Sequence, residues 1–287
     1  EQHSGVEAAA GLPPDLMAAP DDFPRLVALV DLRSCVVCTD RGDVVLHSGM
    51  GEPAPTFTML DRAAGPRPRR LTCLRTLRAV AHPLVCAGGP EGDLMLVSVD
   101  GSFATIRWQG HGGPVQSVYL TPGPAKGSAC VFSVEHGILV WWLLSDCGTV
   151  RAAVRAVASF ALDTKVAAAQ GYVQALLWSA ADGLLWVGDR SGTLTAFSAP
   201  RELADTEAAD PDPRHPVATF HKLHGNKKSI TYLARRPNGV LVTAGRDGYY
   251  REFLLVGGGG GGAPTLRAVA KFKAAAKMDW IVELVYC

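Results

Sequence analysis

Cysteine and histidine are the side chains in this sequence whose spacing suggests metal or redox chemistry. Cys35 and Cys38 form a C-x-x-C pair, a spacing found in zinc sites and in redox-active dithiols. They lie in a strand-like run, where residues three apart point to opposite faces, and no second close pair completes a four-ligand site. We therefore predict that Cys35 and Cys38 are buried strand thiols. The seven cysteines are scattered and odd in number, so we predict reduced thiols in an intracellular protein.

Histidine and glycine motifs give no firmer indication of catalysis. His111 and His224 belong to turns of a repeated unit, which leaves His136 and His221 without a set of metal ligands. Residues 257–262 are six glycines that satisfy G-x-G-x-x-G trivially, and no phosphate-binding helix follows them. Nucleophile-elbow, Walker A and His-Glu-x-x-His motifs are missing. We predict no catalytic residue, no metal and no cofactor.

Clustered positive charge is the better functional lead, because Arg and Lys bind phosphate oxygens without reading base sequence. One cluster contains Arg67, Arg69 and Arg70, followed by Arg75 and Arg78. A second contains Lys227 and Lys228, just past the His224-Gly225 turn, and its neighbours are Lys222, Arg235, Arg236 and Arg246. We predict RNA contact for Arg67, Arg69, Arg70, Lys227 and Lys228; the alternative is solvated loops. The acidic stretch 201–212 is a solvated loop or meets a basic partner.

Length and composition favour a β-rich body. The chain has 287 residues, a net charge of +1, 31 glycines and 19 prolines, which interrupt it too often for long helices. Its apolar runs are shorter than the roughly 18 to 20 residues that cross a bilayer, and no targeting signal is visible. We expect a cytoplasmic protein that engages no membrane.

The elements that must position these residues are clearest in 221–256. Three β-type runs, 229–234, 240–243 and 249–255, are separated by Pro-Asn-Gly and Arg-Asp-Gly turns. Such an antiparallel meander cannot bury both of its faces alone, so the sequence is expected to repeat it, as a β-propeller does.

The repeat is visible along the chain. After a linker at 1–22, the propeller region is expected over 23–287, with blade-like units at 23–49, 71–99, 112–145, 170–198 and 223–256 and a partial unit at 278–287. One turn glycine recurs at spacings of 45 to 56 residues, at positions Gly42, Gly92, Gly137, Gly192 and Gly248. The excess over roughly 40 to 45 residues per compact repeat falls in connections, mainly 50–70, 198–220 and 257–266. Residues 150–170 fit a helix or an outer strand, and we favour the strand.

The best-preserved unit resembles a WD repeat. These repeats carry a Gly-His turn, a Ser or Thr on the next strand, an Asp in the following turn and then a Trp. His224, Thr243, Asp247 and Phe253 match these places as structural residues, with Phe for Trp. Such a histidine, hydroxyl and carboxylate can satisfy one another inside a sheet while the aromatic ring shields them. The third unit matches at Gly110-His111 and Trp142, but His136 stands where Asp is expected.

Four short sequence segments resemble one family more closely. LHGNKKSITYL and TAGRDGYYREF, preceded by LWVGDRSGTLTAF and followed by KMDWIVEL, are similar to the central region of the WD repeat-containing protein six family. The similarity is clearest over 172–287 and thin before residue 110. It implies an all-β WD40-type β-propeller of about five recognisable blades and the start of a sixth, from a larger protein with more than one propeller. Closed, open and partial forms remain alternatives.

The resemblance also implies a non-catalytic role. Members of this family are scaffolds that bind tRNA and an FtsJ-like methyltransferase, which places a 2′-O-methyl group on the ribose of the wobble nucleotide; DNA is not an expected partner. One alternative is a general protein-interaction propeller in signalling or ubiquitin-ligase assemblies, which would use face residues of the third blade such as Trp141. The other is an enzyme built on a propeller, for which no site is recognisable.

Overall fold

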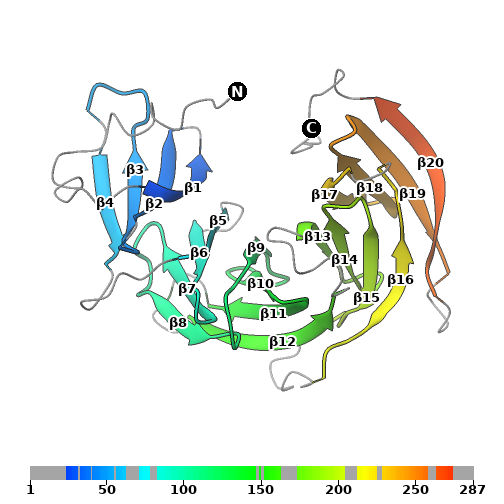
Figure 1. Cartoon of the computed structure of the whole chain (residues 1–287), viewed down its shortest axis with the longest axis horizontal. Coiled ribbons are helices and arrows are strands. Elements are labelled where there is room, and N and C mark those ends of the chain that lie inside the picture. The colour runs from blue at the N-terminus through cyan, green and yellow to red at the C-terminus, as the bar shows by residue number, and fades with distance from the viewer. Residues whose placement is uncertain are drawn as a thin grey trace. The chain divides into compact units, whose positions relative to one another are not determined.

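Strands, turns and loops make up the part of the chain that a computed structural model describes. The described residues are 24–31, 33–39, 41–54, 56–62, 71–77, 83–146, 149, 152–162, 173–203, 212–224, 228–257 and 263–273. They form five four-stranded sheets (Figure 1). Within these ranges no helix is long and apolar enough to span a membrane.

The five sheets use the strands in sequence order. The first is β1 (Pro24–Asp31), β2 (Ser34–Thr39), β3 (Val44–Ser48) and β4 (Thr56–Asp61). The second is β5 (Cys73–Leu77), β6 (Leu84–Gly88), β7 (Asp93–Ser98) and β8 (Ile106–Gln109). The third is β9 (Ser117–Pro122), β10 (Ala129–Glu135), β11 (Ile138–Ser145) and β12 (Ala153–Ala161). The fourth is β13 (Val173–Ser179), β14 (Leu184–Asp189), β15 (Leu194–Ser198) and β16 (Pro216–Phe220). The fifth is β17 (Ile230–Arg235), β18 (Val240–Gly245), β19 (Tyr249–Val256) and β20 (Thr265–Lys273).

The recurring glycine occupies one structural position, the turn between the second and third strands of each sheet. In all five turns its φ lies in the left-handed region, between 75° and 88°, where a side chain is disfavoured. The glycines are Gly42, Gly92, Gly137, Gly192 and Gly248. The repeat inferred from their spacing is therefore confirmed.

A fourth strand completes each sheet, and most of these strands were missed from the sequence. The connections expected at 50–70, 198–220 and 257–266 contain β4, β16 and the start of β20, so they are not wholly loops. These strands are outermost in their sheets and largely exposed, so they lack the apolar alternation that identifies a strand. For 150–170 the expected outer strand is confirmed by β12.

Contacts divide the chain into two compact units. The first contains residues 1–135 and 141–155, and the second contains 136–140 and 156–287. In the first unit, apolar side chains of the first and second sheets share a core cluster that includes Val36, Val44 and Met95. In the second unit, the fourth and fifth sheets share a cluster that includes Trp186, Leu241 and Phe253. Each unit therefore has its own apolar interior between sheets.

The described cysteines are free thiols. Cys35 and Cys38 are 6% and 1% exposed on β2, so the prediction of buried strand thiols is confirmed. Among the described residues, no group of three or more His, Cys, Asp and Glu could hold a metal ion. The expected linker at 1–22 and the partial unit at 278–287 lie outside the described residues.

Candidate functional site

One rim of the second unit collects both the WD-type side chains and exposed positive charge. Antiparallel pairing places the β14–β15 turn beside the end of β16, because Leu194 pairs with Phe220. It likewise places the start of β17 beside the end of β18, because Ile230 pairs with Gly245. The connection between the two sheets joins these ends, since the Leu223 amide donates to the Gly192 carbonyl and Arg251 donates to the Leu223 carbonyl. We call this edge, with turns 190–193, 221–224, 228–229 and 246–248, the His224 rim.

His224 is the centre of a buried hydrogen-bond network on this rim. Its Nδ1 lies 2.8 Å from Asp247 Oδ1, and its Nε2 lies 2.8 Å from Thr243 Oγ1. The histidine and the threonine are fully buried. Asp247 also accepts hydrogen bonds from the Tyr249 amide, at 3.1 Å, and from Arg251, at 2.7 Å. Both ring nitrogens are thus occupied, which fixes the ring and leaves it no free atom for catalysis.

Burial and charge shift the ionisation of this pair. Burial lowers the pKa of His224 below 6.5, because it penalises the imidazolium, and the partly opposing effect of Asp247 does not offset this. Burial also acts to raise the pKa of Asp247, but hydrogen bonding to His224 and the charge of Arg251 bring that pKa below 3.8. At neutral pH the network therefore holds a neutral imidazole and a carboxylate.

The third repeat builds a related network with a different acid. His111 Nε2 lies 2.7 Å from Ser133 Oγ, and Trp142 Nε1 donates to the same oxygen at 2.8 Å. The Glu135 carboxylate lies 3.4 Å from His111 Nδ1. Glu135 thus fills the acidic role that the repeat pattern places at position 136, where the exposed His136 stands at φ 39°. Its longer side chain reaches the histidine from one position earlier.

Phe253 takes the Trp position of the fifth repeat without the hydrogen bond. It pairs across the sheet with Leu241 and is 5% exposed within the core shared by the fourth and fifth sheets. A phenyl ring has no N–H to donate to Thr243, so its contribution is apolar packing. Arg251, which the sequence analysis did not single out, instead connects Asp247 to the Leu223 carbonyl.

Exposed cations lie beside the network on the same rim. Lys228, at the start of the β17 segment, is exposed, as are Lys222 and Arg190. The nearest acids are already engaged: Asp189 is buried and accepts from Ser191 and Thr193, and Asp247 is in the network. The rim therefore presents net positive charge to solvent, as a phosphate-binding surface requires.

Sequence proximity wrongly grouped two arginines with this rim. Arg235 is the last residue of β17, and Arg236 follows it. Arg235 pairs with Asp182 at 2.7 Å, and Arg236 pairs with Glu252 at 2.6 Å. One strand length therefore separates both of them from Lys228. Arg246 is half-buried in the β18–β19 turn.

The remaining residues predicted from the sequence lie outside the described ranges or away from the His224 rim. Arg67, Arg69, Arg70, Arg78 and Lys227 lie outside the described residues, and Arg75 is exposed on β5. Trp141, expected on a binding face of the third blade, is fully buried and stacks on Phe132 with ring centroids 5.4 Å apart. A partner could not contact it, so that surface assignment is wrong. Arg190 was missed because only the pairing of β14 with β15, and of β15 with β16, brings its turn to this rim.

Comparisons with known proteins support the fold. No protein-family model matches the chain, and no curated protein sequence matches it. The structure is similar to Kluyveromyces marxianus Hsv2, with 12% identity, coverage of 89% of this chain and 75% of that chain, and a TM-score of 0.55. Kluyveromyces lactis Hsv2p gives 13% identity, coverage of 89% and 75%, and a TM-score of 0.54. The WD40 β-propeller domain of Doa1 gives 15% identity, coverage of 90% and 71%, and a TM-score of 0.48.

Identities this low show the fold alone. The five four-stranded sheets and the similarity to the two Hsv2 structures establish an all-β, WD40-type β-propeller fold, as predicted from the sequence.

Proposed function

We propose that this chain is a non-catalytic WD-repeat scaffold that binds tRNA and an FtsJ-like methyltransferase, and so supports 2′-O-methylation of the wobble ribose. The similarity of residues 172–287 to the WD repeat-containing protein six family points to this role. In this proposal the propeller holds the tRNA backbone and the enzyme together, so that the anticodon loop reaches the active site of the methyltransferase.

The observation that carries the RNA contact is the His224 rim. Arg190, Lys222 and Lys228 are exposed there, and the nearest carboxylates are buried or hydrogen-bonded. Flexible cations on a rigid β-sheet edge suit phosphate oxygens spaced along a backbone, and such contacts depend little on base identity. Arg67, Arg69, Arg70 and Lys227 remain part of the proposed RNA-binding set.

Charge reversal on the rim tests this proposal. The variant Arg190→Glu, Lys222→Glu, Lys228→Glu is expected to bind tRNA more weakly, and its log affinity should fall less steeply with log salt, by about 0.7 to 0.9 per lost phosphate contact. Fluorescence anisotropy with labelled tRNA across a salt series measures both quantities. Wobble-ribose methylation reconstituted with the partner enzyme should decline in parallel.

A matched control changes the same amount of charge elsewhere. Arg33, Lys126 and Arg267 are exposed and belong neither to the His224 rim nor to the Arg67–Arg70 cluster, so their replacement by Glu should leave the salt slope nearly unchanged. Circular dichroism checks that both variants fold. If the folded rim variant binds tRNA as the parent chain does, the assignment of RNA binding to this rim is wrong.

A general protein-interaction role is the second candidate. The fold is similar to a chain in the solved mitotic checkpoint complex, with 13% identity, coverage of 90% of this chain and 67% of that chain, and a TM-score of 0.50. Affinity purification that recovers protein partners, but no tRNA and no RNA-modifying enzyme, would favour this role.

A further inference from the structure

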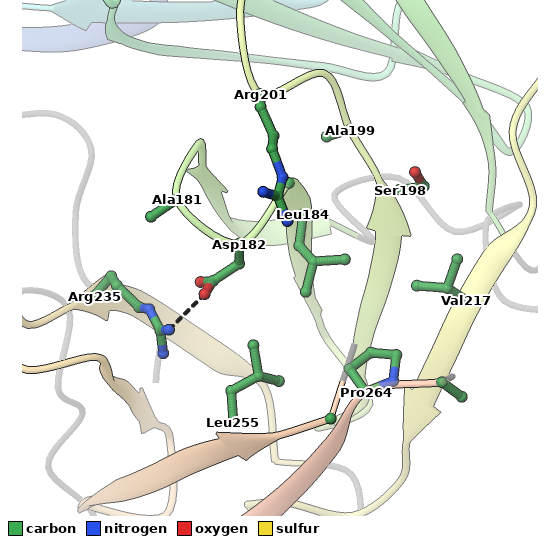
Figure 2. A pocket seen from close by; sticks show the side chains of 13 residues that line it. Ala181, Asp182, Leu184, Ser198, Ala199, Arg201, Val217, Arg235, Leu255 and Pro264 are labelled. Carbon is green, nitrogen blue, oxygen red and sulfur yellow. Dashed lines mark hydrogen bonds and ion pairs between the residues drawn. The ribbon is translucent and has the colours of Figure 1, made fainter. Parts of the chain in front are cut away.

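A cavity of about 710 Å³ lies at one edge of the fourth and fifth sheets (Figure 2). The strand directions make this the edge of the second unit opposite to His224. Its lining comes from the β13–β14 turn, the ends of β15, β17 and β19, and the segment that leads into β20. The volume falls in the range of about 300 to 1,000 Å³ that is typical of ligand sites. We call this edge the Asp182 rim.

Apolar side chains form the inner wall of the cavity. Leu184 and Leu255 belong to the core cluster between the fourth and fifth sheets, so this wall continues the interior of the unit. Pro264 is buried beside them, and Val217 is 37% exposed on β16. An aliphatic group entering the cavity would cover the parts of Leu255 and Val217 that water still reaches.

An ion pair forms a fixed polar wall. Asp182 Oδ1 accepts from Arg235 at 2.7 Å, and its Oδ2 accepts from the Ser179 hydroxyl at 2.6 Å. Arg235 also donates to the Gly239 carbonyl. Because the charges of Asp182 and Arg235 already satisfy one another, neither of them calls for a charged ligand.

Arg201 is different. It is exposed, and no acceptor or acid among the described residues is within hydrogen-bonding or ion-pairing distance of its guanidinium. Its side chain lies over Gly183, where a Cβ would be 3.0 Å from Nε, and Figure 2 shows it pointing towards Leu184. Among the described residues, the lining thus carries one positive charge without an ion-pair partner, next to an apolar wall.

We propose that this cavity binds a peptide segment of a partner protein in which a carboxylate side chain lies next to an aliphatic one. The carboxylate would accept paired hydrogen bonds from Arg201, and the aliphatic group would rest on Leu184 and Leu255. A peptide is favoured because the cavity borders β16, the outermost strand of its sheet, along which an extended segment can lie. This site uses no RNA contact and goes beyond the proposed tRNA function.

A peptide array tests the inference directly. The folded 287-residue chain is incubated with peptides that carry Asp or Glu beside Leu, Ile or Val in varied flanking sequence, and with counterparts that carry Asn or Gln instead. We expect binding to acidic-aliphatic peptides, and about tenfold or greater loss on amide substitution, because a charge-assisted pair is replaced. An array without any acidic-aliphatic preference would overturn the proposal.

Variants of the lining residues test whether the peptide binds in the cavity. Arg201→Ala should weaken the best array peptide about tenfold, and Val217→Asp should weaken it further by adding a negative charge at the wall. The matched control is Arg190→Ala, an exposed arginine on the opposite rim, which should leave the peptide affinity unchanged. Equal peptide binding by the Arg201 variant and the parent chain would show that the cavity is not the site.

Two further measurements distinguish the peptide site from a small-acid site and from the RNA-binding rim. Isocaproate offers a carboxylate and an aliphatic end without a peptide backbone, so binding as tight as that of the peptide would mean a small-acid site and would refute the peptide assignment. Arg201→Ala should leave tRNA affinity unchanged, whereas the triple variant of Arg190, Lys222 and Lys228 should leave peptide affinity unchanged. Failure of one proposal is therefore distinguishable from failure of the other.

Discussion

His224 shows why a chemically capable residue can be purely structural. Both of its ring nitrogens are engaged by side chains within the same blade, and its side chain has no exposed surface. A general base needs a free nitrogen within reach of a substrate proton, which this geometry denies. The same burial gives the residue a measurable effect on stability, because it alters when the imidazole takes up a proton.

Acidification should destabilise the chain through this histidine. Burial lowers the pKa of His224 below 6.5, so the unfolded state binds the proton first, and stability is lost as pH falls below about 6.5. The effect is at most about 1.4 kcal/mol per pH unit per group. Asp247, whose pKa is also lowered, adds a loss of the same sign at more acidic pH. Urea unfolding between pH 7.5 and 5.5 should show the decline.

Histidine variants show which residue causes the change of stability with pH. His224→Gln keeps hydrogen-bonding capacity but does not titrate, so its stability should vary less with pH than that of the parent chain. His215→Gln, at an exposed position, should leave the slope as it is. A slope that survives in the His224 variant would assign the pH dependence elsewhere, first to buried His111, whose pKa burial also lowers.

Strand position within a sheet governs how much of each element the sequence reveals. The central strands β6, β14 and β18 are buried along their whole length, so they are recognisable in the sequence as apolar runs. The outermost strands β16 and β20 are mostly exposed, and hydrogen bonding to one neighbour defines them. Some glycines are also required in the strands, because atoms of other elements lie where a side chain would be.

Gly245, the last residue of β18, should be intolerant of any side chain. An added Cβ would lie 2.6 Å from His224 Cγ and 2.7 Å from the Ser229 carbonyl oxygen. Both neighbours are buried, so Gly245→Ala should cost about 1 to 3 kcal/mol of unfolding free energy through overpacking. Thermal and urea unfolding measure this loss.

Gly112 provides the contrasting glycine. A Cβ there would meet nothing within 4 Å, so Gly112→Ala should change stability by no more than about 0.5 kcal/mol. Equal stability of the two alanine variants would argue against the close approach of β18 to the His224 turn.

The described part of the chain follows a repeat plan in which four-stranded sheets share apolar core clusters with a neighbouring sheet. The described cysteines are examples of this packing, since they lie in strands of the first three sheets and most of them are buried. Burial raises the pKa of Cys73 and of Cys130 to about 11 in each case, and raises that of Cys86 well above 9.0. Their reactive thiolate form is therefore scarce at neutral pH.

Alkylation should accordingly report global unfolding. In native conditions at about pH 8, iodoacetamide should modify Cys86 and Cys130 far more slowly than a free thiol of ordinary pKa near 8.5. Denaturant should remove the difference, and peptide mass spectrometry follows each site. Thr219→Cys, at an exposed position on β16, supplies the fast reference. Native labelling of Cys86 as fast as the reference would contradict its burial.

By itself the sequence determined the local features of this protein. The meander, its turn glycines and the buried thiols of β2 follow from alternating side chains and from φ > 0 at the turns, which involve neighbouring residues only. The His, Thr and Asp of the fifth repeat are recognisable for the same reason, because one blade contains all three.

Tertiary structure alone decided which distant residues share an edge. The direction of each strand puts Arg190 with Lys228 and sends Arg235 to the other rim, although Arg235 is nearer to Lys228 in sequence. Side-chain reach made Glu135 the partner of His111, and packing buried Trp141. The cavity under Arg201 likewise depends on how the fourth and fifth sheets meet, which no local pattern of residues encodes.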